Sequence, residues 1–414
     1  MKKYFNKRYV FVFRFFSGLK SVRNREWIPC GSPAIYKILE SVNEREINSE
    51  VILLCKTPHE SERISRVTHV KLAELRYIDF TIVPFYSFTR IKRIDYILNG
   101  CLHFLFTAKY VISHKPCILY CDRINMYIGA FFSLFKKPKV ILRLLGVLDY
   151  MEFYQKKINA LRYPLKYFSM RAPFSYIICT RDGSPAELFL SNYANKASPY
   201  LVLLNGIDKQ ISSSLNQNFF KKRNKIKILF VGKFGEDKGI LELIEAIKIV
   251  KNQGCDNFSA IVLGDGYLKE KVNRMLQSYD LKDSIELKGT LPHSDIYDYY
   301  KKADIYISLN KRGNLSNTVL EALACGCCLI ILGKNKNGVD EDTESLIPDD
   351  CAKKISRDHI KEDLSGKLIS LLNNPAQIEE YRKRAQCLAQ KILVGWEERL
   401  NMEVNILEKL ATSA

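Results

Sequence analysis

The chain has 414 residues, 47% of them hydrophobic, and a formal net charge of +19. This length exceeds the size at which one hydrophobic core keeps growing, so we expect two domains, and the spread of apolar residues along the chain excludes a disordered protein. Residues 1–200 carry a net charge of about +17, whereas residues 228–414 carry about −3. This asymmetry predicts that the first half alone faces an anionic partner.

The N-terminal segment superficially resembles a secretion signal, but Arg14 interrupts its apolar run and no small-residue cleavage site follows. We therefore expect a first β-strand there. The longest uncharged apolar stretch in the middle of the chain, 124–135, is too short to span a bilayer. The twelve cysteines are scattered through mostly apolar runs, which favours buried, reduced thiols over a disulfide framework. These features predict a cytoplasmic protein without a transmembrane anchor.

Short β-rich runs alternate with helical patterns along most of the chain. Such apolar strands, separated by segments of helix length, predict parallel sheets that are covered by helices on both faces. After residue 350 the pattern is entirely helical. The strand candidates lie within residues 8–16, 49–55, 79–85, 116–121, 139–147, 175–180, 200–206, 226–234, 258–266, 284–291, 303–310 and 328–334.

Two successive sets of these units predict an α/β protein with two Rossmann-like, doubly wound domains that face a central cleft. We expect the first domain to comprise residues 1–208 and the second 226–385. A polar and basic linker, 209–225, would join them, and helices in 386–414 would pack back toward the first domain. Doubly wound sheets bind ligands beyond the carboxyl ends of their strands, so the residues that follow each strand are the candidates for a site.

The strand that ends at Gly232 is followed by Lys233 and Lys238, and a helix begins near Gly239. Two ammonium groups and a helix N-terminus in one loop would suit a diphosphate, because both supply positive charge without a metal. The alternative is a pair of solvated loop lysines.

A second helix begins after the strand within 303–310, with Asn317 as its expected N-cap. The amides of Thr318 and Val319 in its first turn could then hold a phosphate. Glu321, one turn further on, would accept hydrogen bonds from the hydroxyls of a sugar ring. The alternative is that this carboxylate only stabilises the helix N-terminus.

Two other groups could suggest a metal. Cys325, Cys327 and Cys328 include a C-x-x-C pair, but no second pair lies at zinc spacing and the residues run directly into a strand. This pattern predicts apolar packing at a helix end. The acidic triplet at 340–342 lies in what reads as a polar loop after the last strand. We expect no metal site and no cofactor.

Five segments occur in an order that resembles the retaining, nucleotide-sugar-dependent glycosyltransferases with the GT-B fold, called family 4 or group 1. The resemblance covers most of residues 200–400. In the first half only the layout matches, with Gly31 placed where that family has a glycine-rich loop before the first helix. The segments are NGID at 205–208, VGKFGEDKG at 231–239, GDG at 264–266, SNTVLEALACG at 316–326 and GWEER at 395–399.

The resemblance implies roles for particular residues. Lys233 and Lys238 would be catalytic, because they would bind the donor diphosphate and stabilise the leaving nucleotide. Glu321 would hold the nucleotide ribose. The family's other acidic residue, which contacts the transferred sugar, would fall at Gly313, where this chain has no carboxylate. The resemblance also implies that the substrates are bound at Gly31, Gly232, Leu291, Ser316, Asn317, Thr318 and Val319.

The implied activity is transfer of a sugar, with retention of configuration, from a UDP- or GDP-linked donor to a glycan or lipid-linked acceptor. The setting would be synthesis of a bacterial surface polysaccharide, such as lipopolysaccharide, O-antigen or capsule. The basic first domain would bind the acceptor and attach peripherally to the anionic inner face of the plasma membrane. We expect no nucleic-acid partner, since no motif supports one. The alternatives are a nucleotide-sugar epimerase on the same fold and a non-catalytic protein that binds sugar nucleotides or membranes.

Overall fold

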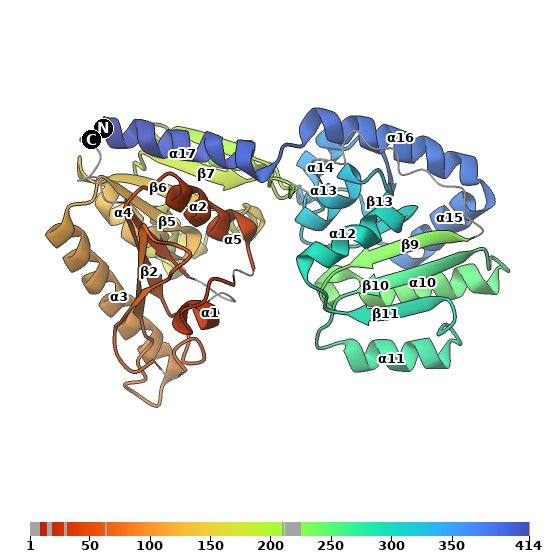
Figure 1. Ribbon diagram of the computed structural model, residues 1–414, viewed down its shortest axis with the longest axis horizontal. Helices are drawn as coiled ribbons and strands as arrows, with labels where there is room; N and C mark the ends of the chain where they lie inside the picture. Colours follow the sequence, from red (N-terminus) through yellow and green to blue (C-terminus); the bar gives the residue numbers. More distant parts are fainter. Residues whose placement is uncertain are drawn as a thin grey trace. The chain divides into compact units, whose positions relative to one another are not determined.

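The computed structural model describes residues 9–413, apart from 15–18, 29–30, 63, 209–210 and 212–224. The chain forms two compact units (Figure 1). Unit 1 comprises Met1–Thr180, Glu187–Leu203 and Glu397–Ala414, and unit 2 comprises Arg181–Ala186 and Leu204–Trp396. The C-terminal segment therefore returns to the unit in which the chain begins.

Unit 1 contains an eight-stranded sheet in the order β3-β4-β2-β1-β5-β6-β7-β8. Its inner strands are apolar and buried along their length, as expected for strands covered on both faces. The strands are β1 (Tyr9–Phe13), β2 (Ser49–Leu54), β3 (Thr68–Lys71), β4 (Ile78–Val83), β5 (Ile118–Asp122), β6 (Lys139–Leu144), β7 (Tyr176–Thr180) and β8 (Tyr200–Leu203).

The sheet of unit 1 is not wholly parallel, contrary to the expectation. Strand β3 was missed in the sequence, and it pairs antiparallel with β4 at the edge of the sheet. Only Val70 of its four residues is buried, so the strand lacks the continuous apolar run that identified the others. An antiparallel edge strand on an otherwise parallel sheet is a common arrangement.

The helices of unit 1 include a long helix, α3, that the sequence analysis did not identify. They are α1 (Leu19–Arg23), α2 (Pro33–Glu44), α3 (Lys92–His114), α4 (Met126–Ser133), α5 (Leu148–Gln155), α6 (Asn159–Arg162), α7 (Pro164–Ser169), α8 (Ala186–Tyr193) and α17 (Trp396–Thr412), with a 3-10 turn η1 (Arg123–Asn125).

A buried charge cluster joins α17 to the sheet of unit 1. The fully buried Glu403 accepts hydrogen bonds from Tyr120 of β5 and Arg399 of its own helix. Its Oε1 also lies 3.6 Å from Nε of Arg143, a fully buried residue of β6. Desolvation raises the pKa of Glu403, but the charges of Arg399 and Arg143 outweigh it and hold the pKa below its usual value. Glu403 is therefore ionised and is the carboxylate that both buried guanidinium groups share.

Unit 2 contains a parallel six-stranded sheet in the order β11-β10-β9-β12-β13-β14. The strands are β9 (Ile226–Val231), β10 (Phe258–Leu263), β11 (Ile285–Gly289), β12 (Ile305–Ser308), β13 (Cys328–Leu332) and β14 (Ala352–Ile355). The helices are η2 (Glu236–Lys238), α10 (Ile240–Asn252), α11 (Lys269–Ser278), α12 (His293–Lys302), α13 (Asn317–Ala324), α14 (Glu341–Leu346), α15 (Ile360–Asn373) and α16 (Pro375–Ile392).

Two separate hydrophobic clusters cover the two faces of this sheet. Ile228 and Phe230 of β9 belong to one cluster, with apolar residues of α10, α11 and α15. Leu229, between them, belongs to the other, with residues of α12, α13 and α16. Because alternate side chains of a strand point to opposite faces, this division confirms the expected doubly wound arrangement.

Two expectations for the end of the chain were wrong. Residues after 350 are not purely helical, because β14 extends the sheet; its AKKI sequence is too short and basic to be recognised as a strand. The segments 204–208 and 386–396 belong to unit 2 instead. They pair with each other through Ile207 and Gly395, and α16, which contains the start of the second segment, is joined to the rest of unit 2 by the hydrogen bond from Arg382 to Asp304. The expected linker, 209–225, lies almost entirely outside the described residues.

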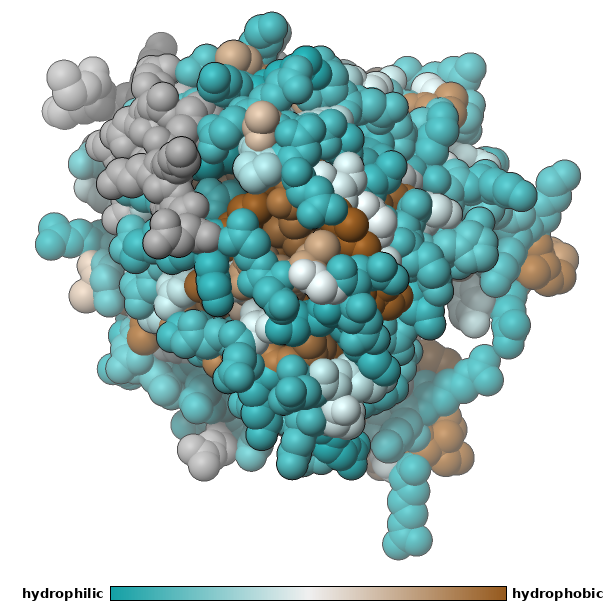
Figure 2. Space-filling view, turned by 90° about the vertical axis from the view of Figure 1, so that its right-hand side faces the viewer, coloured by the Kyte–Doolittle hydropathy of each residue, from teal (hydrophilic) through white to brown (hydrophobic). Residues whose placement is uncertain are grey.

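Hydrophilic side chains cover most of the surface at the unit 2 end of Figure 1, with apolar residues visible mainly in recessed areas (Figure 2). Among the described residues, none of the helices combines the length and apolar character that a bilayer crossing requires.

The Glu403 cluster predicts a large difference between two conservative substitutions in α17. Glu403→Gln should lower the free energy of unfolding by about 3–5 kcal/mol, because it leaves two buried guanidinium groups uncompensated. Glu408→Gln removes only a partly exposed ion pair with Arg45 and should cost about 0–1 kcal/mol. Urea denaturation followed by circular dichroism measures both; equal effects would contradict the assignment of the cluster as a buried tether.

Candidate functional site

The candidate site lies at the carboxyl ends of β9 and β12, which are neighbours in the sheet of unit 2. From β9 the chain continues to β10 on one side, and it later returns to place β12 on the other. This is a topological switch point, where the loops after two adjacent strands diverge and leave room for a ligand. The predicted residues Gly232, Lys233 and Lys238 follow β9, and the stretch from Asn310 to Glu321 follows β12.

Lys238 is fixed at this edge, whereas Lys233 is exposed. The Nζ of Lys238 donates to Oδ1 of Asn310 at 3.0 Å and lies 3.6 Å from Oδ2 of Asp237. Burial lowers the pKa of Lys238; Asp237 opposes this, and the neighbouring charges of Arg312 and Lys233 lower the pKa further. An anion bound here would relieve the mutual repulsion of these cations.

The loops after β9 and β10 approach so closely that a side chain cannot fit between them. An ideal Cβ on Gly264 would lie 1.9 Å from the carbonyl oxygen of Gly232. The GDG segment therefore supports the loop that carries Lys233 and Lys238.

The N-terminus of α13 differs in one respect from the expectation. Ser316 takes the N-cap position, and Asn317 is the first helical residue. The amide of Val319 donates to the Ser316 carbonyl at 3.0 Å, so it is not available to a phosphate as expected. Within the described chain, the amides of Asn317 and Thr318 have no acceptor. These are the two donors that the helix presents to a ligand.

Glu321 is buried and takes part in a chain of side chains that the sequence analysis did not foresee. Its Oε1 lies 2.8 Å from Nε2 of His293, and Nδ1 of His293 lies 3.0 Å from Oδ2 of Asp208. The other oxygen, Oε2, is buried and accepts no hydrogen bond from the described residues. Hydrogen bonds to Asp208 and Glu321 raise the pKa of His293 to about 10, so the ring is protonated at neutral pH.

The segment at 204–208 brings two further groups to this helix. Asn205 donates through Nδ2 to Oδ1 of Asn317 at 2.7 Å. The next residue, Gly206, packs directly on the backbone of Trp396, because an ideal Cβ there would lie 2.6 Å from the Trp396 Cα. The NGID and GWEER segments, far apart in sequence, thus meet in unit 2 and position Asn205 and Asp208.

Gly313 has a structural reason to lack a side chain. Its φ is +119°, and an ideal Cβ would lie 2.1 Å from the carbonyl oxygen of Asp182. Asp182 belongs to the segment Arg181–Ala186 that is part of unit 2. A carboxylate at position 313 would need this segment to move.

The acidic triplet is not the polar loop that we expected. Asp340 is fully buried and accepts hydrogen bonds from Asn314, Thr343 and Arg357, and α14 begins immediately after it. Asp342 pairs with Arg181 through Nη1 at 2.7 Å. These carboxylates connect the segment around Gly313 with its neighbours.

The three cysteines after α13 are core residues, as predicted. Cys325, Cys327 and Cys328 are at most 1% exposed. Burial raises the pKa of the Cys327 and Cys328 thiols to about 12, so they are protonated and unreactive at neutral pH.

Two further predicted positions are Leu291, which precedes His293 by two residues, and Gly31. Leu291 follows β11 and packs on the edge of the apolar cluster that contains Val319. Gly31 is an exposed residue of unit 1 with a φ of +100°, and it precedes α2 rather than the first helix of the chain.

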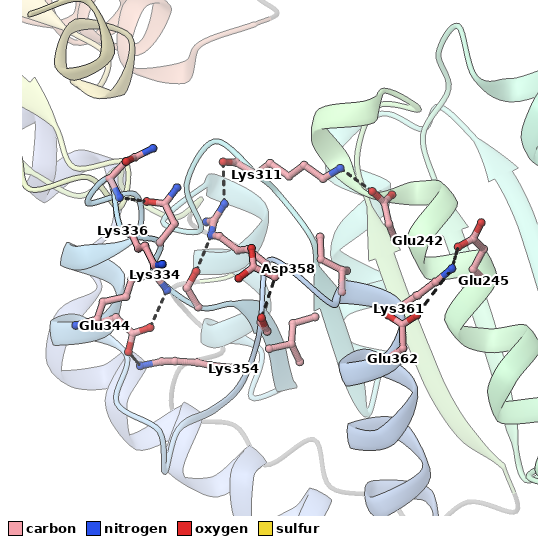
Figure 3. Close-up of a pocket in the computed structure, with 17 residues that line it drawn as sticks. Glu242, Glu245, Lys311, Lys334, Lys336, Glu344, Lys354, Asp358, Lys361 and Glu362 are labelled. Atoms are coloured by element: carbon pink, nitrogen blue, oxygen red, sulfur yellow. Dashed lines mark hydrogen bonds and ion pairs between the residues drawn. The ribbon is translucent and has the colours of Figure 1, made fainter. Parts of the chain in front are cut away.

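A separate pocket of about 1170 Å³ lies at the carboxyl ends of β13 and β14 and contains none of the predicted residues (Figure 3). Its cations are largely paired: Lys311 lies 2.6 Å from Glu242, and Lys354 lies 2.7 Å from Glu344. These ion pairs compensate most of the positive charge that an anionic ligand would need.

Unit 1 has a pocket of its own, of about 1060 Å³, at the carboxyl ends of its strands. Its walls are mostly apolar and include Leu105 of α3 and Phe131 of α4. The polar end holds Lys56, which has no ion-pair partner among the described residues and whose Nζ lies 3.5 Å from Nδ1 of His103. Burial lowers the pKa of Lys56 to about 8 and that of His103 to about 4. This pocket thus joins an apolar cavity to a cation.

The environment of Gly313 predicts a graded response to alanine. Gly254 also has a positive φ, +76°, but no atom lies within 4 Å of its ideal Cβ. Gly254→Ala should therefore cost about 1–2 kcal/mol of unfolding free energy from backbone strain alone. Gly313→Ala should lower the unfolding free energy by more than this, because the clash of the new Cβ with the Asp182 carbonyl is added to the backbone strain. Chemical denaturation compares them, and equal losses would mean that the Asp182 contact is unimportant.

The Asp208–His293–Glu321 chain predicts a pH-dependent contribution to stability. The pKa of His293 is raised from 6.5 to about 10, so its contribution is fully present below pH 6.5 and is lost as the pH rises through about 10. His293→Gln should therefore destabilise the protein most at or below pH 6.5 and least above pH 10. Chemical denaturation at several pH values between 6.5 and 10 measures this loss of unfolding free energy. The control is His59→Gln, a substitution at an exposed histidine. A His293→Gln effect that does not change with pH would exclude a protonated His293.

Comparison with known proteins relates the second half of the chain to one family. Residues 213–389 match the family described as glycosyl transferases group 1. An uncharacterized glycosyltransferase of Methanocaldococcus jannaschii is 26% identical over 206 residues, which cover 50% of this chain and 49% of the relative. The amylovoran biosynthesis glycosyltransferase AmsK of Erwinia amylovora is 32% identical over 123 residues, 28% of this chain and 29% of the relative. The chain thus matches about half the length, or less, of these curated relatives.

Solved structures match the whole chain. The sucrose-phosphate synthase of Thermosynechococcus elongatus has a TM-score of 0.71 at 15% identity, with 99% of this chain and 100% of that chain covered. Anabaena HepE in complex with UDP-glucose has a TM-score of 0.64 at 14% identity, covering 98% and 99%. At these identities the likeness concerns the fold. The chain therefore has the GT-B fold, and its residues 213–389 are similar to the group 1 glycosyl transferases.

Proposed function

We propose that the protein is a retaining glycosyltransferase that takes its sugar from a UDP- or GDP-linked donor without a metal ion. One observation carries the proposal: Lys238, the amides of Asn317 and Thr318 and the buried Glu321 lie at the same sheet edge. Among the described residues these amides have no acceptor and Oε2 of Glu321 has no donor. Cations and helix amides suit a diphosphate, and the unsatisfied carboxylate oxygen suits a ribose hydroxyl. HepE, of the same fold, was crystallised with UDP-glucose.

The proposed chemistry follows from where charge develops. When the bond between the sugar and the diphosphate breaks, its electron pair stays with the phosphate oxygen, and the sugar gains positive character. Lys233, Lys238 and the α13 amides would stabilise the growing negative charge, and they would be in place before the reaction begins. Gly313 supplies no carboxylate to the sugar, so the donor sugar would be held by groups other than the family's usual acidic residue.

We assign the acceptor to the pocket of unit 1. Its apolar walls and the ammonium of Lys56, which has no ion-pair partner among the described residues, favour an acceptor that combines an apolar part with an anionic group, as in a lipid-linked glycan. AmsK is named for the biosynthesis of amylovoran, which supports a role in bacterial surface polysaccharide synthesis. The basic first half of the chain favours attachment to the inner face of the plasma membrane.

The donor site is tested by binding of nucleotides. In a thermal-shift screen, UDP or GDP at 100 times its dissociation constant should stabilise the protein by about 2.7 kcal/mol. Lys238→Ala should weaken this binding roughly ten- to a hundredfold, because a hydrogen bond to a charged group contributes about 1.5–3 kcal/mol. Lys271→Ala, an exposed lysine of α11, is the matched control and should bind as the wild type.

The outcomes separate this function from its rivals. If no nucleotide or nucleotide sugar raises the melting temperature, the donor site is wrongly assigned. Binding without release of the nucleotide from any donor would favour a non-catalytic protein, and conversion of the donor sugar without transfer would favour an epimerase. NMR of the product would show whether the anomeric configuration is retained.

A further inference from the structure

Helix α3 of unit 1 buries a stripe of polar residues and exposes most of its large apolar residues. Asp95, Asn99, His103 and Thr107, spaced four residues apart, are all at most 5% exposed. Three of them bind the segment at 84–89: Asp95 accepts from the amides of this segment, Asn99 bonds to its backbone, and His103 lies 3.2 Å from its first carbonyl oxygen. This polar stripe fixes the rotation of the helix, so its apolar stripe faces outward.

The outward stripe continues onto neighbouring elements to form what we call the apolar surface. Its members come from α3, the end of α4 and the helices α6 and α7; α3 packs on α4, α4 on α7, and α7 on α6. Phe104 of α3 and Phe131 of α4 are in contact, with ring centroids 5.1 Å apart. The most exposed members, each more than 60% exposed, include Ile97, Leu105, Ile112, Leu134, Leu161 and Leu165.

The chain around the apolar surface is basic and almost without acidic residues. The segments 90–115, 126–139 and 156–171 carry thirteen Lys and Arg residues and one carboxylate, the buried Asp95. Lys136 and Lys137 follow the exposed Leu134 and Phe135, and Lys156 and Lys157 precede Ile158. Apolar side chains ringed by cations of one sign are typical of surfaces that lie in the interfacial region of an anionic bilayer.

The charge decides between a bilayer and a second copy of the chain. In a two-fold symmetric dimer the same patch would face itself, so the cations of both copies would be brought together without acidic partners. Anionic headgroups would instead neutralise them while the apolar side chains leave water.

We propose that unit 1 docks on an anionic lipid bilayer through the apolar surface, which specifies the membrane attachment included in the proposed function. The proposed acceptor pocket shares Ile97, Leu105 and Leu165 with this surface. A lipid-linked acceptor can therefore reach the pocket of the docked protein from the bilayer, with its lipid part remaining among apolar side chains.

Co-sedimentation of the full chain with vesicles tests the surface. Wild type should bind vesicles of phosphatidylcholine mixed with phosphatidylglycerol much more strongly than vesicles of phosphatidylcholine alone. Leu134→Glu combined with Leu161→Glu should abolish binding, since both side chains are strongly exposed and outside the pocket. Leu188→Glu, at an exposed leucine of α8 outside the surface, is the matched control and should bind as wild type.

The charged ring is tested separately. Lys136→Gln with Lys137→Gln should weaken binding to the mixed vesicles by roughly an order of magnitude, and this difference should shrink as salt is added. The control is Lys271→Gln with Lys282→Gln, at two exposed lysines of unit 2. It should leave binding to the mixed vesicles almost unchanged.

The proposal is overturned if wild type does not bind the mixed vesicles or if the Leu134→Glu and Leu161→Glu double variant binds them as well as wild type. It is also overturned if wild type is a dimer without lipid that this double variant converts to a monomer. Nucleotide thermal shifts of the same variants separate the two proposals. A preserved UDP or GDP shift without vesicle binding leaves the donor site standing, whereas vesicle binding without any nucleotide shift leaves the surface standing.

Discussion

The candidate site of unit 2 depends on how closely its strand-end loops approach one another. The loop after β10 rests on the carbonyl of Gly232, and the loop after β12 rests on that of Asp182, with no room for a Cβ in either contact. Contacts between backbones leave little freedom for the side chains that these loops carry. Lys238 and Glu321 can therefore be held in place before a ligand arrives, which is the condition for electrostatic stabilisation without reorganisation.

The sequence was sufficient to predict the elements that have strong local signals. The apolar runs of β1 and β13 and the order of strands and helices were enough to identify two doubly wound domains. The exceptions were β3 and β14, whose few residues are polar or basic because they lie at sheet edges. Edge strands bury one side only, so their sequences lack the continuous apolar run by which the others were recognised.

In the site, the sequence indicated the residues that follow strands but not the groups that reach them from elsewhere. His293 begins α12 and Asp208 precedes β9 in the chain, so neither lies in the loops after β9 and β12. Only the tertiary structure brings them to Glu321. For Gly313 the sequence showed that a carboxylate is missing, but the reason, the carbonyl of Asp182, comes from a segment more than a hundred residues away. Such contacts have no local pattern.

The exposure of the cysteines has a practical consequence. Of the eleven described, all are free, and only Cys101 and Cys387 are exposed. Cys101 belongs to unit 1 and Cys387 to unit 2. Among the described cysteines, thiol-reactive spin labels or fluorophores would thus react preferentially at one position in each unit. Labels at these two positions would report, by distance measurement in solution, the separation of the two units with and without an added nucleotide.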